Sequence, residues 1–198
     1  MADDQTTRAS LLLRIRNSDD AQAWTQFAEI YAPLIHRFAK KNGLQDADAS
    51  DLAQEVLGAV AKSIGRFDYD PEVGRFRSWL FTVARNRLNT QLGKQSRQPR
   101  GSGDTGVHQA LASRPQDDSE LERVWDEEYE QRLFQWAAEK VRDQFTDNTW
   151  QAFWQTGVEN RPTDDVAKGL QLSVGAVYIA RSRVLARLKE VIEQVDDR

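Results

Sequence analysis

Residues 74–101 read GRFRSWLFTVARNRLNTQLGKQSRQPRG, a stretch that combines a helical apolar pattern with an unusual charge pattern. Its larger apolar side chains recur every three or four positions, which is the spacing of one face of an α-helix. No Asp or Glu occurs between Arg75 and Gly103, although the 198-residue chain carries a formal net charge of −4. The stretch therefore predicts a long helix from about Arg75 to Gln95 with an apolar face and a cationic face.

Charge is segregated along the rest of the chain as well. The basic residues of the quoted stretch are Arg75, Arg77, Arg85, Arg87, Lys94, Arg97 and Arg100. Residues 116–130 are strongly acidic, and a second basic segment without any acid follows between Asp165 and Glu190. Two separated basic segments in an acidic chain predict two separate contacts with a polyanion.

Composition excludes several classes of protein. The chain has no Cys, which excludes disulfides and Cys-based metal sites. The chain has no run of about eighteen apolar residues, so we expect no membrane span. The N-terminus lacks the basic and apolar pattern of a signal peptide. We therefore expect a cytoplasmic protein that does not contact a membrane.

Apolar periodicity predicts helices and no strands. A first helix is expected from Ser18, its N-cap, to about Lys41, with Pro33 bending or splitting it. A second helix is expected over residues 46–67. Residues 96–119 are rich in Gly, Ser, Pro, Gln and Asp, a composition typical of a flexible linker.

These patterns predict an all-α protein of two small helical domains joined by a flexible linker. The first domain is expected over residues 1–95, the linker over 96–119 and the second domain over 120–198. Helical periodicity returns after the linker, which is why a second packed domain is expected there.

The segment RPTDDVAKGLQLSVGAVYIARSRVLARLKEVIEQV, residues 161–195, predicts a helix-turn-helix in the second domain. Thr163 and Ser173 are the expected N-caps of its two helices. The inner face of the second helix is expected to hold Val174, Val177, Val184 and Leu188. Side chains suited to base edges and phosphates in a major groove are Ser173, Tyr178, Arg181, Ser182, Arg183 and Arg187. An ordinary amphipathic helical hairpin is the alternative.

Acidic side chains gather on one face of the predicted helix 46–67, at Asp48, Asp51 and Glu55. A metal site that includes His36 is conceivable. Carboxylates near a helix start are, however, common partners of the helix dipole, and hard metals need further ligands. We therefore predict neither a metal nor a cofactor.

Two stretches carry a resemblance to a known family, DASDLAQEVLGAV at 48–60 and FDYDPEVGRFRSWLFTVARNRL at 67–88. They resemble region 2 of bacterial RNA polymerase sigma factors of the extracytoplasmic-function (ECF) type. The second domain resembles region 4 of these factors, and the linker stands where ECF factors lack region 3. The resemblance extends from about Ser18 to Glu193.

The resemblance implies a protein that is no enzyme but binds core RNA polymerase and directs promoter recognition, promoter melting and transcription initiation. In the family, the first domain binds and opens the −10 element, and the second binds the −35 element as duplex. The residues it places at the −10 element are Phe67, Arg75, Arg77, Arg85, Asn86, Arg87, Lys94 and Arg97. Phe67 would stack on an unpaired base, and packing at a helix end is its alternative role.

The resemblance also implies a polymerase-binding face, formed by Asp48, Asp51, Gln54 and Glu55. Ser50 stands where relatives commonly carry a third acid. Phosphorylation of Ser50, or of Ser63 on the same helix, would restore negative charge there. An unmodified helix serine is the alternative. Control by an anti-sigma factor or by a Ser/Thr protein kinase stays open.

A second class of function is a stand-alone helix-turn-helix regulator that binds operators without polymerase. Such regulators usually bind palindromic sites as dimers, which suits a monomer of two tethered domains poorly. An enzyme is disfavoured, because the chain has two histidines and no Gly-rich phosphate loop, GxSxG or HExxH motif.

Overall fold

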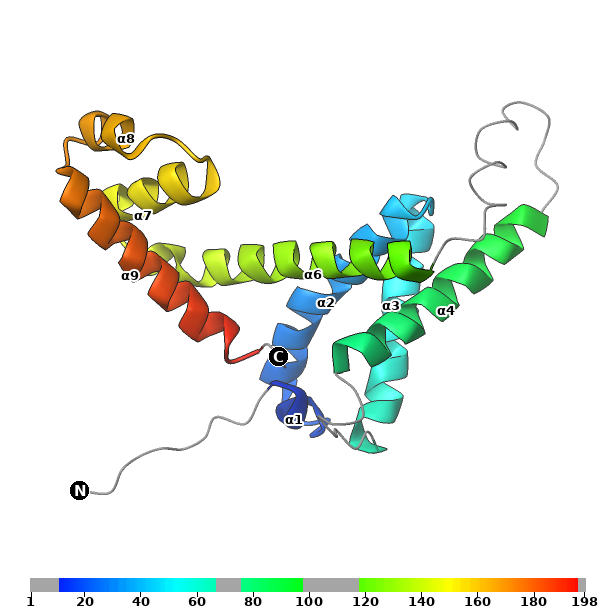
Figure 1. The fold of residues 1–198 in the computed structure, drawn as a ribbon. Helices are drawn as coiled ribbons and strands as arrows, with labels where there is room; N and C mark the ends of the chain where they lie inside the picture. The colour runs from blue at the N-terminus through cyan, green and yellow to red at the C-terminus, as the bar shows by residue number, and fades with distance from the viewer. Residues whose placement is uncertain (1–10, 67–75, 98–117, 196–198) are drawn as a thin grey trace, which may run out of the picture. The chain divides into compact units, whose positions relative to one another are not determined.

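The structure of the protein is a computed structural model that describes residues 11–66, 76–97 and 118–195 (Figure 1). Every secondary-structure element within these residues is helical, which confirms the all-α prediction. The chain divides into two compact units, unit 1 with residues 1–132 and 197–198, and unit 2 with residues 133–196. None of the described helices is both long and apolar enough to cross a membrane.

Within the described residues, unit 1 contains four helices and the first part of a fifth. They are α1 (Leu11–Ile15), α2 (Ala21–Lys41), α3 (Asp46–Ser63), α4 (Phe76–Arg97) and α6 (Asp118–Val141) as far as Arg132. Helix α3 packs along α2 on one side and along α4 on the other. A short 3₁₀ turn, Ile64–Arg66, follows α3 and accounts for the end of the helix that was predicted over 46–67.

An aromatic cluster forms the centre of unit 1. The rings of Phe27, Tyr31 and Phe76 contact one another with centroids 4.4 to 5.9 Å apart, and all three side chains are buried. Leu52 and Val56 add fully buried side chains from α3. Each large apolar side chain buried in this way stabilises the fold by about 1.5–3 kcal/mol, so the apolar stripes of α2, α3 and α4 fix these helices together.

The prediction that Ser18 caps α2 is wrong. Asp20 is the N-cap, and its carboxylate accepts a hydrogen bond from the Ala23 N–H at 2.9 Å. Arg14 donates to the same carboxylate at 2.9 and 3.0 Å. The cap therefore lies at Asp20 because this carboxylate also binds α1, a helix that the sequence did not predict. Pro33 does not split α2, which continues through it.

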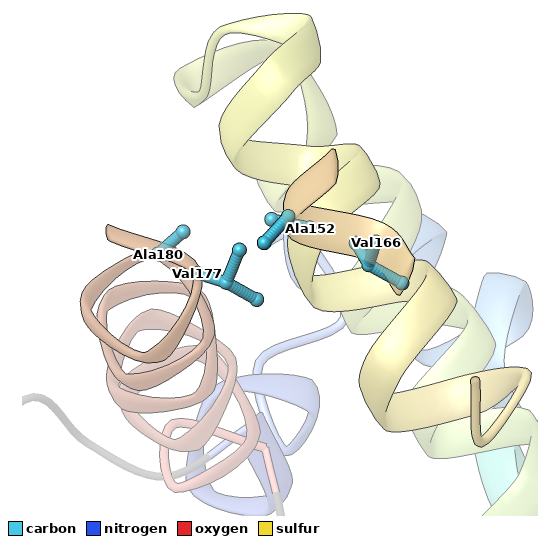
Figure 2. Packing of buried hydrophobic residues seen from close by; sticks show 5 residues of the cluster. Ala152, Val166, Val177 and Ala180 are labelled. Atoms are coloured by element: carbon cyan, nitrogen blue, oxygen red, sulfur yellow. The ribbon is translucent and has the colours of Figure 1, made fainter. Parts of the chain in front are cut away.

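Unit 2 contains the end of α6 and three shorter elements that surround a small core. They are α7 (Asp147–Phe153) with its π-helical continuation η3 (Trp154–Val158), α8 (Thr163–Gly169) and α9 (Val174–Ile192). A 3₁₀ turn, Arg142–Gln144, precedes α7. Figure 2 shows side chains of three helices meeting, with Ala152 from α7, Val166 from α8, and Val177 and Ala180 from α9. Small side chains in this cluster let the helix backbones approach closely.

The connection from α8 to α9 is a tight helix-turn-helix junction. Gln171 adopts a φ of 55°, a left-handed conformation that stops the chain from continuing as a helix. Ser173 then caps α9, and its Oγ accepts a hydrogen bond from the Ala176 N–H at 3.1 Å, which confirms the predicted cap.

Two details of the junction differ from the sequence-based expectation. Thr163 is the first residue of α8 and not its N-cap, because Pro162 already occupies the cap position. Val174 is 38% exposed and not part of the inner face, because the buried stripe of α9 begins one turn later, at Val177.

The pH dependence of stability tests the contact between α1 and α2. The guanidinium of Arg14, and then the Ala23 N–H, lower the pKa of Asp20 below its ordinary value of 3.8. Because the pKa of Asp20 is lower in the folded chain than in the unfolded chain, Asp20 contributes its full stabilisation at any pH above its pKa in the unfolded chain. This contribution is lost as the pH falls through the folded pKa.

We therefore expect Asp20→Asn to unfold at lower urea concentration than the wild type at neutral pH, and this difference to shrink below about pH 4. Urea unfolding over a pH series measures it. Asp19→Asn is the control, because Asp19 neither caps α2 nor pairs with Arg14 among the described residues. A wild-type advantage that does not change with pH would contradict the assignment.

Candidate nucleic-acid interfaces

The outer face of α3 is polar and acidic. Asp51, Gln54 and Glu55 are exposed, whereas the apolar residues between them pack into unit 1. Asp48 is half-buried at the edge of the same face. The structure therefore brings the four residues predicted to bind polymerase onto one helix surface, with three of them open to solvent.

The outer face of α4 carries exposed polar and basic side chains, namely Asn86, Arg87 and Lys94. Arg87 Nη1 donates to Glu55 Oε2 at 3.1 Å, so the cationic face of α4 is linked to the acidic face of α3. Both side chains are 48% exposed, and such a solvated ion pair contributes little to stability. Other predicted −10 residues lie outside the described residues: Phe67, Arg75 and the side chain of Arg97.

Arg77 and Arg85 of α4 pair with acids from α6. Asp126 Oδ1 lies 3.2 Å from Arg77 Nη2, and Asp118 Oδ2 lies 2.7 Å from Arg85 Nη1. The guanidinium of Arg77 also lies over the ring of Tyr129, 5.0 Å from its centroid. With this cover, the Arg77 and Arg85 side chains are only 17% and 26% exposed. Two cations predicted to contact nucleic acid are thus paired within the chain.

These acids belong to residues 118–132, which we call the acidic segment and which form part of unit 1. Its main anchor is Trp125, which is 1% exposed and contacts the rings of Phe38 and Phe81 at centroid distances of 5.3 and 5.9 Å. Leu121 and Tyr129 are also buried, at positions one helical turn before and after Trp125. The acidic segment therefore packs on α2 and α4 through an apolar stripe.

Arg132 ends the acidic segment with a contact that depends on Pro33. In a regular helix the N–H of residue 33 would bond to the carbonyl of Glu29, but proline has no N–H. Arg132 donates to this carbonyl from Nε and Nη2, at 3.2 and 2.8 Å. A side chain thus replaces the missing backbone donor, which explains how α2 continues through Pro33.

The apolar periodicity after residue 120 predicts a helix there. It does not predict that this helix contacts α2 and α4. The spacing of Leu121, Trp125 and Tyr129 predicts an apolar face there, yet it does not say which surface that face covers.

The face of α9 predicted to bind DNA is exposed. Its outward side chains are Tyr178, Arg181, Ser182 and Arg183, and a shallow hollow on this face is lined by Tyr178, Arg181, Ser182 and Leu185. Tyr178 is 57% exposed, which is unusual for a large aromatic side chain in a folded domain. Tyr178, Arg181 and Ser182 thus share one surface of α9, whereas Arg183, two positions after Arg181, is exposed on another side of the helix.

Two further residues of the predicted −35 set already have partners. Arg187 donates to Gln144 at 2.7 Å and to Glu190 at 2.8 Å. The Oγ of Ser173 is used as the N-cap of α9. Both can still approach a phosphate, but Arg187 would have to exchange a carboxylate partner for it.

The two serines considered for phosphorylation are bonded to the backbone of α3. Ser50 Oγ donates to the Asp46 carbonyl at 3.0 Å, and Ser63 Oγ donates to the Ala59 carbonyl at 2.8 Å. Such bonds are common for serines inside helices. His36 lies 3.3 Å from Asp46, and in the part of the chain that the structure describes no group of His, Asp and Glu could hold a metal.

Comparisons with known proteins agree on one family. A family model for sigma-70 region 2 matches residues 27–98, which span most of α2 and all of α3 and α4. The chain is 33% identical over 96 residues to the ECF RNA polymerase sigma factor RpoE of Cereibacter sphaeroides. It is 27% identical over 205 residues to the ECF RNA polymerase sigma factor ShbA of Streptomyces griseus subsp. griseus. The chain thus carries a sigma-70 region 2 match and is similar to two ECF RNA polymerase sigma factors.

The extent of these matches differs. The match to RpoE spans about half of each protein, 48% of this chain and 51% of RpoE, whereas the match to ShbA covers 98% of this chain and 100% of ShbA. A solved structure of CnrH in complex with the cytosolic domain of CnrY is similar at a TM-score of 0.36 and 18% identity, covering 92% of this chain and 95% of that one. The acidic segment lies outside the region 2 match.

Proposed function

We propose that this chain is an ECF-type sigma factor, which binds core RNA polymerase through the acidic face of α3 and directs it to promoters through α4 and α9. The observation that carries the proposal is the sigma-70 region 2 match over residues 27–98. Within it, an acidic face and a cationic face lie on neighbouring helices. Faces of opposite charge suit different partners, a protein surface for α3 and DNA phosphates for α4.

The proposed ligand of α4 is the melted strand of the −10 element. The amide of Asn86 suits a base edge, while Arg87 and Lys94 suit phosphates. The proposal includes stacking of Phe67 on an unpaired base. Binding of the single strand lowers the free energy of the open promoter relative to the duplex, so binding energy alone favours melting.

The proposed ligand of α9 is the −35 element as duplex. In a helix-turn-helix, the second helix enters the major groove and presents side chains from its first turns. Tyr178, Arg181 and Ser182 occupy that part of α9 and are exposed. Arg183 is exposed on a different side of α9 and supplies positive charge for a phosphate.

Asp51→Lys tests the polymerase contact. Asp51 is exposed on α3, so reversing its charge should leave the fold intact and weaken association with core polymerase by about tenfold. A pull-down titration and in vitro transcription on genomic fragments measure the two effects. Asp143→Lys is the matched control, because Asp143 is equally exposed but lies in unit 2, outside the region 2 match.

A wild-type chain that neither associates with core polymerase nor directs initiation would contradict the proposed function. Equal association by Asp51→Lys and Asp143→Lys would contradict only the assignment of the contact to α3.

Phosphorylation of Ser50 is our finer proposal for control, with Ser63 as a second site. A phosphate adds a charge of about −1.5 to −2 next to Asp51 and replaces the hydroxyl bond to the Asp46 carbonyl. We expect Ser50→Glu to transcribe more actively than Ser50→Ala with purified core. If the two variants drive the same transcription, the proposal fails at this residue, and an anti-sigma factor is the controlling partner to test next.

Arg183→Ala is expected to weaken binding to a −35 duplex, because Arg183 is exposed on α9. Loss of one phosphate contact would reduce the slope of log affinity against log salt by about 0.9. Duplex titrations at several salt concentrations measure this slope. Lys189→Ala is the control, because Lys189 lies further along α9 and pairs with Glu193 at 3.7 Å. An unchanged slope for Arg183→Ala would rule out a charge contact there.

A further inference from the structure

We propose that the acidic segment, residues 118–132, covers part of the DNA-binding face of α4 and must leave it before a promoter strand can bind. The inference rests on the proposed function, because it assumes that α4 binds the melted strand. It assigns to the chain itself an anionic competitor of that strand.

The contact between the acidic segment and the rest of unit 1 is specific, because it includes apolar packing and hydrogen bonds as well as ion pairs. Trp125 is buried against Phe38 and Phe81, and Arg132 supplies the donor that Pro33 lacks. These two anchors position the acids that lie between and before them on the same helix. The acidic segment is therefore held in one register on α2 and α4.

The acids of this segment reach cations that the proposed function assigns to DNA. A carboxylate and a phosphate present the same group to a guanidinium, namely anionic oxygens at hydrogen-bond distance. Asp126 and Asp118 occupy Arg77 and Arg85 in this way, at 3.2 and 2.7 Å. The carboxylates and the phosphates of a strand would therefore compete for the same two arginines.

The covered state leaves several buried polar atoms without a hydrogen-bond partner among the described residues. They are Arg77 Nη1, Arg85 Nε, Trp125 Nε1 and Glu128 Oε2. The other oxygen of Glu128 lies 2.6 Å from Lys41 Nζ, although the Glu128 side chain is only 3% exposed. Unsatisfied buried groups destabilise a contact, and the two arginine N–H groups could donate to phosphate oxygens. The contact is therefore suited to displacement by a polyanion.

The test compares two double variants of the full-length chain. In Asp118→Asn/Asp126→Asn the carboxylates that pair with Arg85 and Arg77 are removed. We expect this variant to bind a short, fluorescently labelled, mixed-sequence single-stranded oligodeoxynucleotide about fivefold more tightly than the wild type, from the loss of two partly exposed ion pairs. Fluorescence anisotropy at low salt measures the affinity.

Glu120→Gln/Glu122→Gln is the matched control. It removes the same number of negative charges from the same helix, and Glu120 lies in the first turn of α6 as Asp118 does. Within the described residues neither glutamate pairs with Arg77 or Arg85. We expect its affinity for the strand to change by less than about twofold.

Amide hydrogen exchange on the wild type gives a second readout. Addition of the oligonucleotide should speed up exchange in residues 118–132, because a displaced helix loses its protection. A purely structural role for the acidic segment predicts instead that exchange there stays unchanged or slows. It also predicts that Asp118→Asn/Asp126→Asn lowers the midpoint of thermal unfolding without raising affinity. Either result would overturn the inference.

Failure of this inference can be told apart from failure of the proposed function. If core binding and initiation are intact and the two double variants bind the strand equally, or not detectably, only the covering role is wrong. If the chain does not associate with core polymerase, the proposed function is wrong. The comparison of double variants would then still show whether residues 118–132 cover an anion-binding face.

Discussion

Pro33 leaves the carbonyl of Glu29 without its helical donor, and the packing of unit 1 depends on how that gap is filled. Arg132 fills it with two hydrogen bonds, although the two residues are 103 positions apart in the sequence. The same helix buries Trp125 against Phe38 of α2. The contact is partly buried, and an unpaired carbonyl in such a place is costly, so Arg132 stabilises α2 while it holds the acidic segment on this helix.

Ion pairs within unit 1 connect surfaces that we assign to different partners. The Glu55–Arg87 pair links the proposed polymerase face of α3 to the proposed DNA face of α4. The Asp126–Arg77 pair links the DNA face to the acidic segment. Each of these pairs is at least partly exposed, so each is weak and can be exchanged for a stronger external partner. A partner that takes one member of a pair leaves the other member available for a different contact.

Unit 2 reaches its helix-turn-helix through local backbone chemistry and a core of small side chains. The left-handed Gln171 ends α8, and the Ser173 hydroxyl caps α9. Ala152 and Ala180 let the helices pack closely. Because the Ser173 Oγ already accepts a backbone hydrogen bond, the proposed recognition of DNA is assigned mainly to exposed side chains further along α9, such as Tyr178.

The sequence by itself determined the long helices, the acidic face of α3, the cationic face of α4 and the Ser173 cap. These features depend on residues within a few positions of one another, so periodicity and capping chemistry encode them. The tertiary structure alone decided that Asp20 caps α2 and that Asp118 and Asp126 cover Arg85 and Arg77. The Asp20 cap depends on how the neighbouring helix α1, which carries Arg14, packs beside α2. The contacts of Asp118 and Asp126 depend on how helices from distant parts of the chain pack, and the spacing of residues along one helix carries no information about which partner lies across from it.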